Sequence, residues 1–282
     1  MKTVTSKDGT TIAYDQFGNG PALILIAGAT QHRATDPQTA HLAELLASHF
    51  TVFNYDRRGR GDSGDTQPYA AEREIEDIEA LIDESGGSAF VYGISSGAAL
   101  AMKAAIRLDG KIKKVALYEA PYDSTDDAEK AWREYRKHLK QALTENRRGD
   151  AAALFLALVG MPADQIDEMR KEPWWAGFEA VAPTLAYDAE IMGEDRSAPV
   201  KLASQVSVPA LVMNGSASER FMYDTAVALA KATPNAQHRV LEGQTHAVDP
   251  DVLAPVLIEF FKGAEADRPT KPSRRKETTK AG

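Results

Sequence analysis

The amino-acid sequence predicts a doubly wound α/β fold, in which a mostly parallel sheet of about eight strands is interrupted by a helical cap insertion. Short continuous apolar runs alternate with helix-like stretches along most of the 282 residues, and such runs are typical of parallel strands buried on both faces. The alternation breaks between residues 123 and 200, where helical patterns follow one another. One large core with a helical insertion accounts for this pattern and for the chain length.

The strands and helices are expected in the following places. Residues 3–6 and 10–17 are rich in β-branched or aromatic side chains and flank a Lys-Asp-Gly turn, so an antiparallel hairpin is expected. Further strands are expected at 22–26, 51–55, 89–92, 115–118, 208–213 and 237–241. Helices are expected at 37–48, 70–84, 96–108, 126–146, 150–158, 222–232 and 251–261. The chain thus divides into a first core part (1–122), a cap (123–200), a second core part (201–263) and a disordered basic tail (264–282).

Composition excludes several function classes. The 33 Lys and Arg against 41 Asp and Glu give a net charge of −8, so neither a nucleic-acid nor a membrane partner is expected. Without cysteine the chain has no disulfide and no cysteine nucleophile, and no His and carboxylate cluster has metal-ligand spacing, so no metal or cofactor is expected. The apolar run 22–29 is too short to span a bilayer and the first residues form no signal peptide, which favours a cytoplasmic protein. A monomer or homodimer is expected.

The most informative pentapeptide is Gly93-Ile94-Ser95-Ser96-Gly97, which lies between an expected strand and an expected helix. Such a turn holds its serine in a strained conformation, and the two glycines let strand and helix approach closely. A plain Gly-Ser turn without chemical meaning is the alternative for this motif taken alone. At the helix N-terminus, the backbone N–H of Ser96 can stabilise developing negative charge.

With this turn and three further segments the chain resembles the α/β-hydrolase superfamily, over roughly residues 3–262. The segments are Ile26-Ala27-Gly28-Ala29-Thr30, residues 56–64 and Gly243-Gln244-Thr245-His246. The resemblance implies the α/β-hydrolase fold, with Ser95 as nucleophile and His246 as general base. It also implies an oxyanion hole formed by the N–H groups of Ser96 and Ala29, with Thr30 as a substitute for Ala29.

The segment 56–64 resembles the family's DxRGxGxS loop, and we interpret it as structural. Asp56 with an arginine is expected to fix this loop internally. Arg57, Arg58 and Arg60 are expected to be solvated, and an anion site built from them is the less favoured alternative.

The acidic member of the triad departs from the family's commonest pattern. Most relatives place an aspartate after the seventh strand, at a position that is Ser218 here. Some members carry the acid after the sixth strand instead, where this chain has Glu119. The resemblance therefore implies Glu119 as the residue that orients His246, while Glu219 and Asp123 remain alternatives.

These residues predict a serine hydrolase that cleaves a carboxylic ester or lactone of a small to medium apolar molecule through an acyl-enzyme. A ligand-binding or receptor-like protein with little turnover and a cofactor-free perhydrolase or oxygenase are the alternatives. The insertion supplies apolar side chains for a pocket or for its own core: Phe155, Met161, Trp174, Trp175, Phe178, Tyr187 and Met192. The residues expected to line the substrate pocket are His32, Tyr122, Trp174, Trp175 and Phe178.

Overall fold

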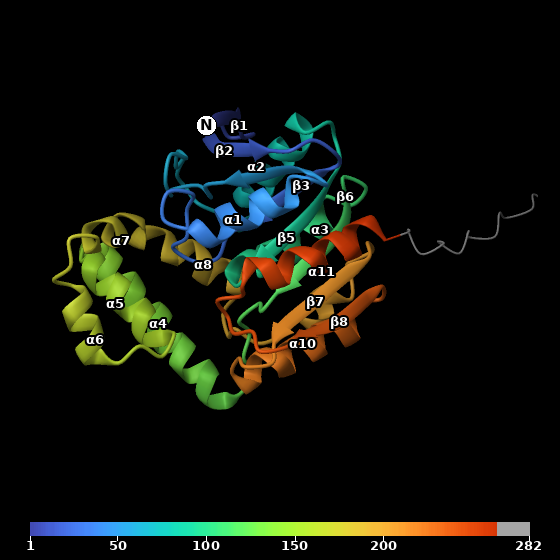
Figure 1. Ribbon diagram of the computed structural model, residues 1–282. Helices are drawn as coiled ribbons and strands as arrows, with labels where there is room; N and C mark the ends of the chain where they lie inside the picture. Colours follow the sequence, from blue (N-terminus) through green and yellow to red (C-terminus); the bar gives the residue numbers. More distant parts are fainter. Residues whose placement is uncertain (264–282) are drawn as a thin grey trace, which may run out of the picture.

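A computed structural model describes residues 1–263 and contains one eight-stranded sheet (Figure 1). The strands lie in the order β1-β2-β4-β3-β5-β6-β7-β8. The first two strands pair antiparallel with each other, β2 pairs antiparallel with β4, and the remaining pairs are parallel. The strand bounds are β1 (Lys2–Thr5), β2 (Thr11–Phe17), β3 (Ala22–Ile26), β4 (Thr51–Tyr55), β5 (Ala89–Ile94), β6 (Ile112–Tyr118), β7 (Ala210–Gly215) and β8 (Ala236–Leu241). The predicted fold class is confirmed.

Helices cover both faces of the sheet, as the apolar runs require. On one face α1 (Pro37–Leu46) packs beside α11 (Pro250–Lys262). On the other face lie α2 (Ala71–Glu84), α3 (Ser96–Arg107) and α10 (Arg220–Ala232). All five residues of β3 are buried, because a central parallel strand has helices above and below it.

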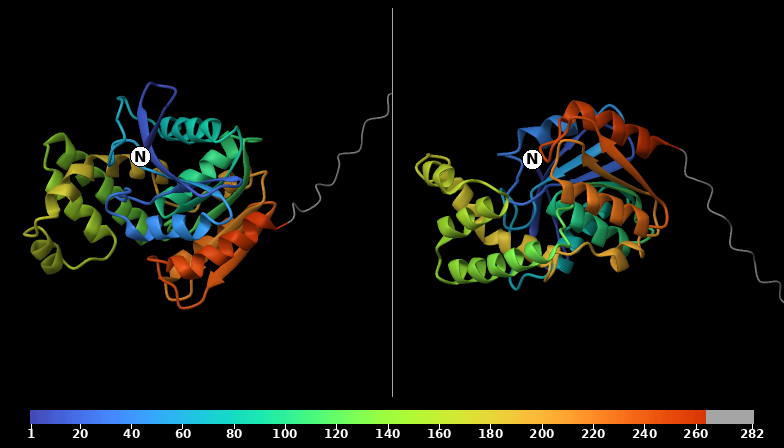
Figure 2. Two further views of the ribbon diagram at one scale, coloured as in Figure 1. Left: turned by 45° about the horizontal axis from the view of Figure 1, so that its top comes forward. Right: turned by 90° about the horizontal axis from the view of Figure 1, so that it is seen from below.

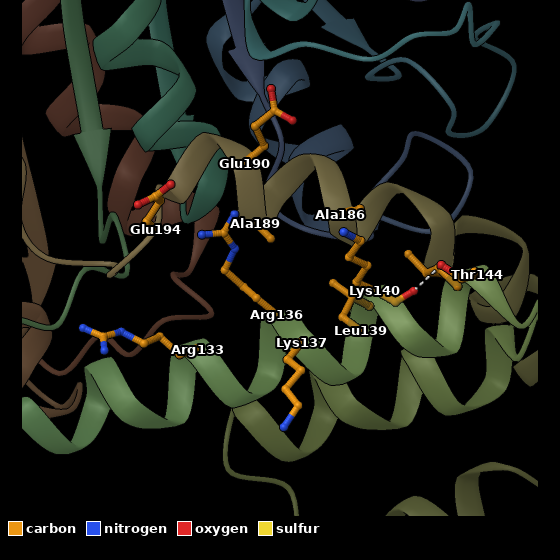
Figure 3. A pocket seen from close by; sticks show the side chains of 11 residues that line it. Arg133, Arg136, Lys137, Leu139, Lys140, Thr144, Ala186, Ala189, Glu190 and Glu194 are labelled. Atoms are coloured by element: carbon orange, nitrogen blue, oxygen red, sulfur yellow. Dashed lines mark hydrogen bonds between the residues drawn. The ribbon is translucent and has the colours of Figure 1, made fainter.

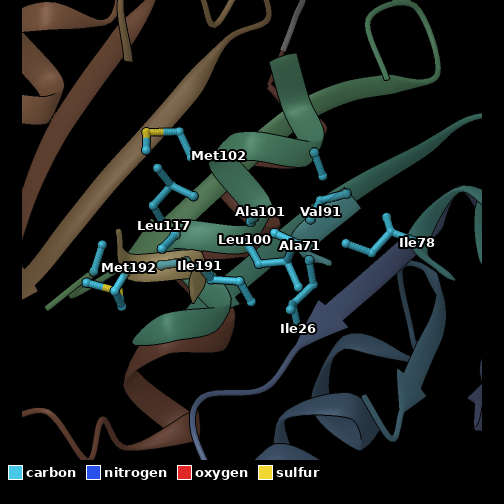
Figure 4. Packing of buried hydrophobic residues seen from close by; sticks show 14 of the residues in the cluster. Ile26, Ala71, Ile78, Val91, Leu100, Ala101, Met102, Leu117, Ile191 and Met192 are labelled. Carbon is cyan, nitrogen blue, oxygen red and sulfur yellow. The ribbon is translucent and has the colours of Figure 1, made fainter. Parts of the chain in front are cut away.

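The helix α3 sits close to the sheet because its inner face is made of small residues. Ala98, Ala99 and Ala101 have no exposed surface. Figure 4 shows side chains from β5, β6 and α3 gathered with Ile191 and Met192 of the helical insertion. The core under the sheet therefore continues into the insertion.

Between β6 and β7 the chain forms the predicted run of helices. They are α4 (Asp126–Thr144), α5 (Arg148–Leu158), α6 (Ala163–Met169), α7 (Trp175–Val181), the 3-10 turn η1 (Ala182–Thr184), α8 (Leu185–Met192) and the short α9 (Val200–Ala203). The group α4 to α7 lies together at one side of the sheet, with α8 between it and the core (Figures 1 and 2). The predicted basic tail, residues 264–282, lies outside the described residues.

No helix within residues 1–263 is long and apolar enough to cross a membrane.

Candidate active site

The Ser95 turn has the strained geometry that its sequence predicts. Ser95 joins β5 to α3 with φ 57° and ψ −129°, a backbone conformation that residues other than glycine rarely adopt. A Cβ atom on Gly97 would lie 2.3 Å from the carbonyl oxygen of Ile26, and one on Gly93 would lie 2.3 Å from that of Gly97. Glycine at both positions is what lets the turn fold this tightly.

Glu119 and His246 meet at the carboxyl end of the sheet, where Glu119 follows β6 and His246 lies on the loop after β8, two strands away. The ring nitrogen Nδ1 of His246 lies 2.8 Å from Oε2 of Glu119, and Oε1 of Glu119 accepts the backbone N–H of Gly215 at 2.7 Å. Burial favours the neutral form of the Glu119 carboxyl. The hydrogen bonds from His246 and Gly215, with the nearby Ser218 hydroxyl, outweigh that effect and lower the pKa of Glu119. This carboxylate therefore stays ionised at neutral pH and orients the imidazole.

The loop that carries His246 is fastened to the ends of β6 and β7. The hydroxyl of Tyr118 donates to the carbonyl of Thr245 at 2.6 Å, and the N–H of Ala217 donates to the carbonyl of Gln244 at 2.9 Å. A Cβ atom on Gly215 would lie 2.0 Å from that Gln244 oxygen, so only glycine allows this approach.

Ser95 and His246 line one cavity, although no hydrogen bond joins the two side chains within residues 1–263. Hydrogen bonds of a catalytic serine are often formed only in the complex with substrate. The His246 side chain is 45% exposed, whereas that of Glu119 has no exposed surface. Glu119 is thus buried behind His246, and the imidazole of His246 is accessible from the cavity.

The predicted oxyanion donors lie at the same end of the cavity. Ala29 and Ser96 both line it, and Ser96 is the first residue of α3, where helix geometry leaves the N–H without an intrahelical partner. A Cβ atom on Gly28 would lie 3.0 Å from Cβ of Ser95, which places this loop directly against the serine. Gln31 accepts the Gly28 N–H at 2.7 Å and holds the loop. Thr30, the substitute donor, lines a neighbouring hollow instead.

The cavity has a volume of about 630 Å³, within the usual range for small-molecule sites. Its wall is mainly apolar and comes from α4, α5, α8 and the start of α10. The side chains concerned are Trp132, Tyr135, Phe155, Leu158, Val159, Leu185, Met192, Phe221 and Met222.

The five residues that the sequence nominated for the pocket lie elsewhere. His32, Trp174 and Phe178 line a second hollow of about 580 Å³, which shares Gln31 and Gln38 with the cavity. Trp175 is buried beside a third hollow, and Tyr122 is buried in the core. These side chains were expected in the pocket because most of them are apolar, but apolar character does not show which face of a helix lies next to Ser95. Phe155 and Met192, two other apolar residues of the insertion, do line the cavity.

A buried ionic cluster beside the oxyanion loop was missed by the sequence analysis. Arg57 donates to Glu74 at 2.7 and 2.8 Å and to Asp188 at 2.8 Å. Arg60 donates to Asp188 at 2.6 Å and to the carbonyl of Gly28 at 2.6 Å. Asp188, on α8, also accepts the hydroxyl of Ser96 at 2.7 Å. The cluster therefore joins the helical insertion to both predicted oxyanion segments.

The expectation of a solvated basic loop is wrong. Arg57, Arg58 and Arg60 are each 0–1% exposed, because the carboxylates of Glu74, Asp77 and Asp188 are buried with them. Within the loop, Asp56 accepts the backbone N–H of Asp62 at 2.9 Å. The arginine that Asp56 binds is Arg33 from another loop, whose backbone and guanidinium N–H groups donate to it at 2.7 and 3.1 Å.

Other groups of residues show fewer features of a functional site. Glu219 is exposed and lines the cavity, but no hydrogen bond or ion pair joins it to His246 among the described residues. A separate hollow of about 510 Å³ between α4 and α8 is lined mainly by charged side chains, among them Arg136, Lys140 and Glu190 (Figure 3). Across residues 1–263 no group of three His, Asp or Glu side chains is arranged to hold a metal ion.

Comparisons with known proteins identify relatives of this chain. The model of the alpha/beta hydrolase family matches residues 23–257. The crystal structure of an alpha/beta hydrolase from Sphaerobacter thermophilus DSM 20745 is 48% identical, covers 92% of this chain and all of that one, and has a TM-score of 0.80.

Two curated proteins are also similar. The non-heme chloroperoxidase of Streptomyces lividans is 25% identical over 287 aligned positions, which cover 93% of this chain and 100% of that protein. The hydrolase YraK of Bacillus subtilis strain 168 is 32% identical over 103 residues, 35% of this chain, and the match spans 37% of the length of YraK.

Proposed function

This chain belongs to the alpha/beta hydrolase family, and from that premise we propose that it cleaves a carboxylic ester or lactone by serine catalysis. One observation carries the proposal: the strained Ser95 opens into the same cavity as a histidine that a buried carboxylate holds at 2.8 Å. Strained residues of this kind cluster at functional sites, and here the strain presents the hydroxyl beside a histidine, which favours catalysis over ligand binding alone.

In the proposed mechanism, Ser95 Oγ attacks the acyl carbon while His246 takes the hydroxyl proton. The N–H groups of Ser96 and Ala29 donate to the oxyanion that forms. The imidazolium, stabilised by Glu119, then protonates the leaving alcohol oxygen, and the acyl group stays on Ser95. Water activated by His246 attacks the acyl-enzyme, releases the carboxylic acid and restores the serine.

The cavity favours a small to medium substrate with apolar parts. Trp132 and Phe155 from the insertion and Phe221 from α10 present hydrocarbon surface beside Ser95. A volume of about 630 Å³ holds an acyl chain and a small alcohol or ring together.

Turnover of 4-nitrophenyl butyrate tests the proposal. Ser95→Ala and His246→Ala are expected to abolish the acyl-enzyme burst. Glu119→Gln is expected to lower kcat about 10³- to 10⁴-fold, because the amide no longer stabilises the imidazolium. The matched control Glu219→Gln is expected to stay near wild type.

Two results would overturn parts of this assignment. If Glu219→Gln loses activity while Glu119→Gln remains active, the acidic member of the triad is Glu219, on the loop after β7. A wild-type protein that shows no burst, and whose Ser95 is not labelled by a fluorophosphonate, would be a ligand-binding protein of this fold.

The similarity to a chloroperoxidase over 93% of the chain favours one second candidate, perhydrolysis. Hydrogen peroxide would then replace water as the nucleophile, so that the acyl-enzyme yields a peroxycarboxylic acid and free Ser95. Peracid formation from acetate and peroxide, measured by bromide oxidation, tests it. Peracid formation that is absent, or that persists in Ser95→Ala, would eliminate this candidate.

A further inference from the structure

Arg196 is a cation in the wall of the Ser95 cavity, and its side chain is held in place from three sides. It lies between α8 and α9, where its Nε donates to the carbonyl of Pro121. Its guanidinium carbon lies 5.6 Å from the ring centres of both Trp132 and Phe221, which also line the cavity. Cation–π contacts of this kind orient a guanidinium without neutralising its charge.

The backbone of Arg196 is fixed as well. Its φ is 57°, a left-handed conformation that costs free energy for an arginine. The carbonyl of Arg196 accepts the N–H of Asp123 at 3.0 Å, which ties this residue to the segment after β6. The surrounding structure therefore maintains one placement of the side chain.

No carboxylate of the described chain pairs with this guanidinium. Within residues 1–263 Arg196 has no ion pair, and its two Nη atoms have no hydrogen-bond partner. Arg57 and Arg58, by contrast, each have two carboxylate partners. Burial lowers the pKa of Arg196, which reflects the cost of keeping this cation away from water, although an arginine remains charged at neutral pH.

Other charges near Arg196 do not replace such a partner. The carboxylate of Asp123 attracts the guanidinium without forming an ion pair with it. Glu219 also lines the cavity, but its side chain is exposed at the start of α10, where solvent screens its charge. The two Nη groups of Arg196 are thus available for a ligand, at a fixed and positively charged position in the cavity wall.

We propose that Arg196 binds a carboxylate of the substrate, so that the natural substrate is an ester or lactone bearing a second, anionic carboxyl group. The planar guanidinium matches a carboxylate with two parallel N–H donors. The apolar wall between the two polar ends would contact the hydrocarbon that separates the carboxylate from the scissile bond. This inference rests on the proposed esterase function and narrows its substrate class.

Matched pairs of esters test it on the wild-type enzyme. Mono-4-nitrophenyl glutarate and 4-nitrophenyl 4-carbamoylbutanoate differ only in a carboxylate or carboxamide on the acyl side. The pair 4-acetoxybenzoate and 4-acetoxybenzamide does the same on the leaving-group side. We expect a higher kcat/KM for the carboxylate in at least one pair. Arg196→Gln should lower that preference about 10- to 100-fold, as expected for a charge-assisted hydrogen bond.

Two further variants separate recognition from general electrostatics. Arg220→Gln removes a guanidinium that is 80% exposed and outside the cavity, so the preference should not change. Glu219→Gln removes an exposed charge that solvent screens, and should change the preference much less than Arg196→Gln does. A wild type that turns over both amides but does not favour either carboxylate would overturn the inference while leaving the proposed function intact. The same conclusion follows if Arg196→Gln keeps the wild-type preference.

Binding to the Ser95→Ala protein gives an answer that does not depend on turnover. By isothermal titration calorimetry, 4-phenylbutyrate should bind at least about 10-fold more tightly than 4-phenylbutyramide. Adding Arg196→Gln should remove the difference without changing the melting temperature enough to indicate unfolding. Equal affinities of acid and amide would refute the carboxylate site even if the protein hydrolyses no ester.

Discussion

Asp188 is the residue whose removal should most weaken the link between the helical insertion and the sheet. It is 6% exposed and accepts hydrogen bonds from Arg57, Arg60 and Ser96 at 2.8, 2.6 and 2.7 Å. With Glu74 it balances the two guanidinium charges in a buried site. Asp188→Asn keeps the size of the side chain but leaves one buried positive charge uncompensated.

The expected cost follows from this charge count. Breaking a buried ion pair by removing one partner typically destabilises a protein by about 3–5 kcal/mol. Arg57 keeps its two bonds to Glu74, so the larger effect falls on Arg60, whose remaining acceptors are the neutral oxygens of Thr184 and Gly28. We therefore expect Asp188→Asn to lower the free energy of unfolding by about 3 kcal/mol or more.

Urea unfolding at pH 7, followed by circular dichroism, measures this change. Asp224→Asn is the matched control, because its carboxylate pairs with Arg220 on an exposed helix face and should contribute less than about 1 kcal/mol. Ser95 labelling by a fluorophosphonate should also slow in Asp188→Asn, since the Ser96 hydroxyl then donates to a neutral amide oxygen, a weaker hydrogen bond than the one to the carboxylate. An unfolding free energy within 1 kcal/mol of wild type would refute the assignment of Asp188 as the anchor.

Three more outcomes are expected. Burial favours the neutral form of Asp188, but the neighbouring guanidinium groups outweigh it and lower its pKa, so the unfolded chain takes up this proton first as the pH falls. The urea midpoint of wild type should thus fall more steeply below about pH 4 than that of Asp188→Asn, and parallel curves would contradict the linkage. Gly215→Ala should destabilise by about 1–3 kcal/mol, because its methyl group would meet a backbone oxygen. Gly177→Ala, in α7, should stabilise the protein by up to about 1 kcal/mol, because a methyl group there would meet no atom outside its own helix within 4 Å. Thermal unfolding of Gly215→Ala and Gly177→Ala checks both signs. Phe155→Ala should lower kcat/KM for 4-nitrophenyl hexanoate about 10-fold. Trp174→Ala, in the second hollow, should change it less than about twofold, and the reverse order would place the acyl chain there.

The order of the elements could be predicted because each depends on local signals. Alternating apolar runs and helical periods predicted the eight strands and seven of the helices, mostly within a few residues of their observed ends, whereas α6, α7, α8 and α9 of the insertion were not predicted individually. Ser95 could be placed because its glycines two residues to either side are a local requirement of the turn. Glu119 could be placed after β6 and His246 after β8, and the parallel register of β6, β7 and β8 brings these two strand ends to the same edge of the sheet.

Features that depend on distant partners could not be predicted in the same way. Arg57 and Asp188 are 131 residues apart, and nothing near either residue in the sequence signals that they pair. A basic stretch is usually solvated, but three buried carboxylates reversed that tendency here. The prediction of the pocket residues was wrong for a related reason. Trp174 and Phe178, at α7, line the second hollow, and the periodicity of one short helix does not determine how that helix is oriented.

The ionic cluster at Asp188 has a consequence for the wall of the cavity. It fixes α8 to the loop after β4 through buried ion pairs. Phe155 and Leu158 of α5 line the same cavity without taking part in the cluster. A displacement of α5 would therefore leave the hydrogen bond between Ser96 and Asp188 intact, and with it the attachment of the oxyanion segment to α8.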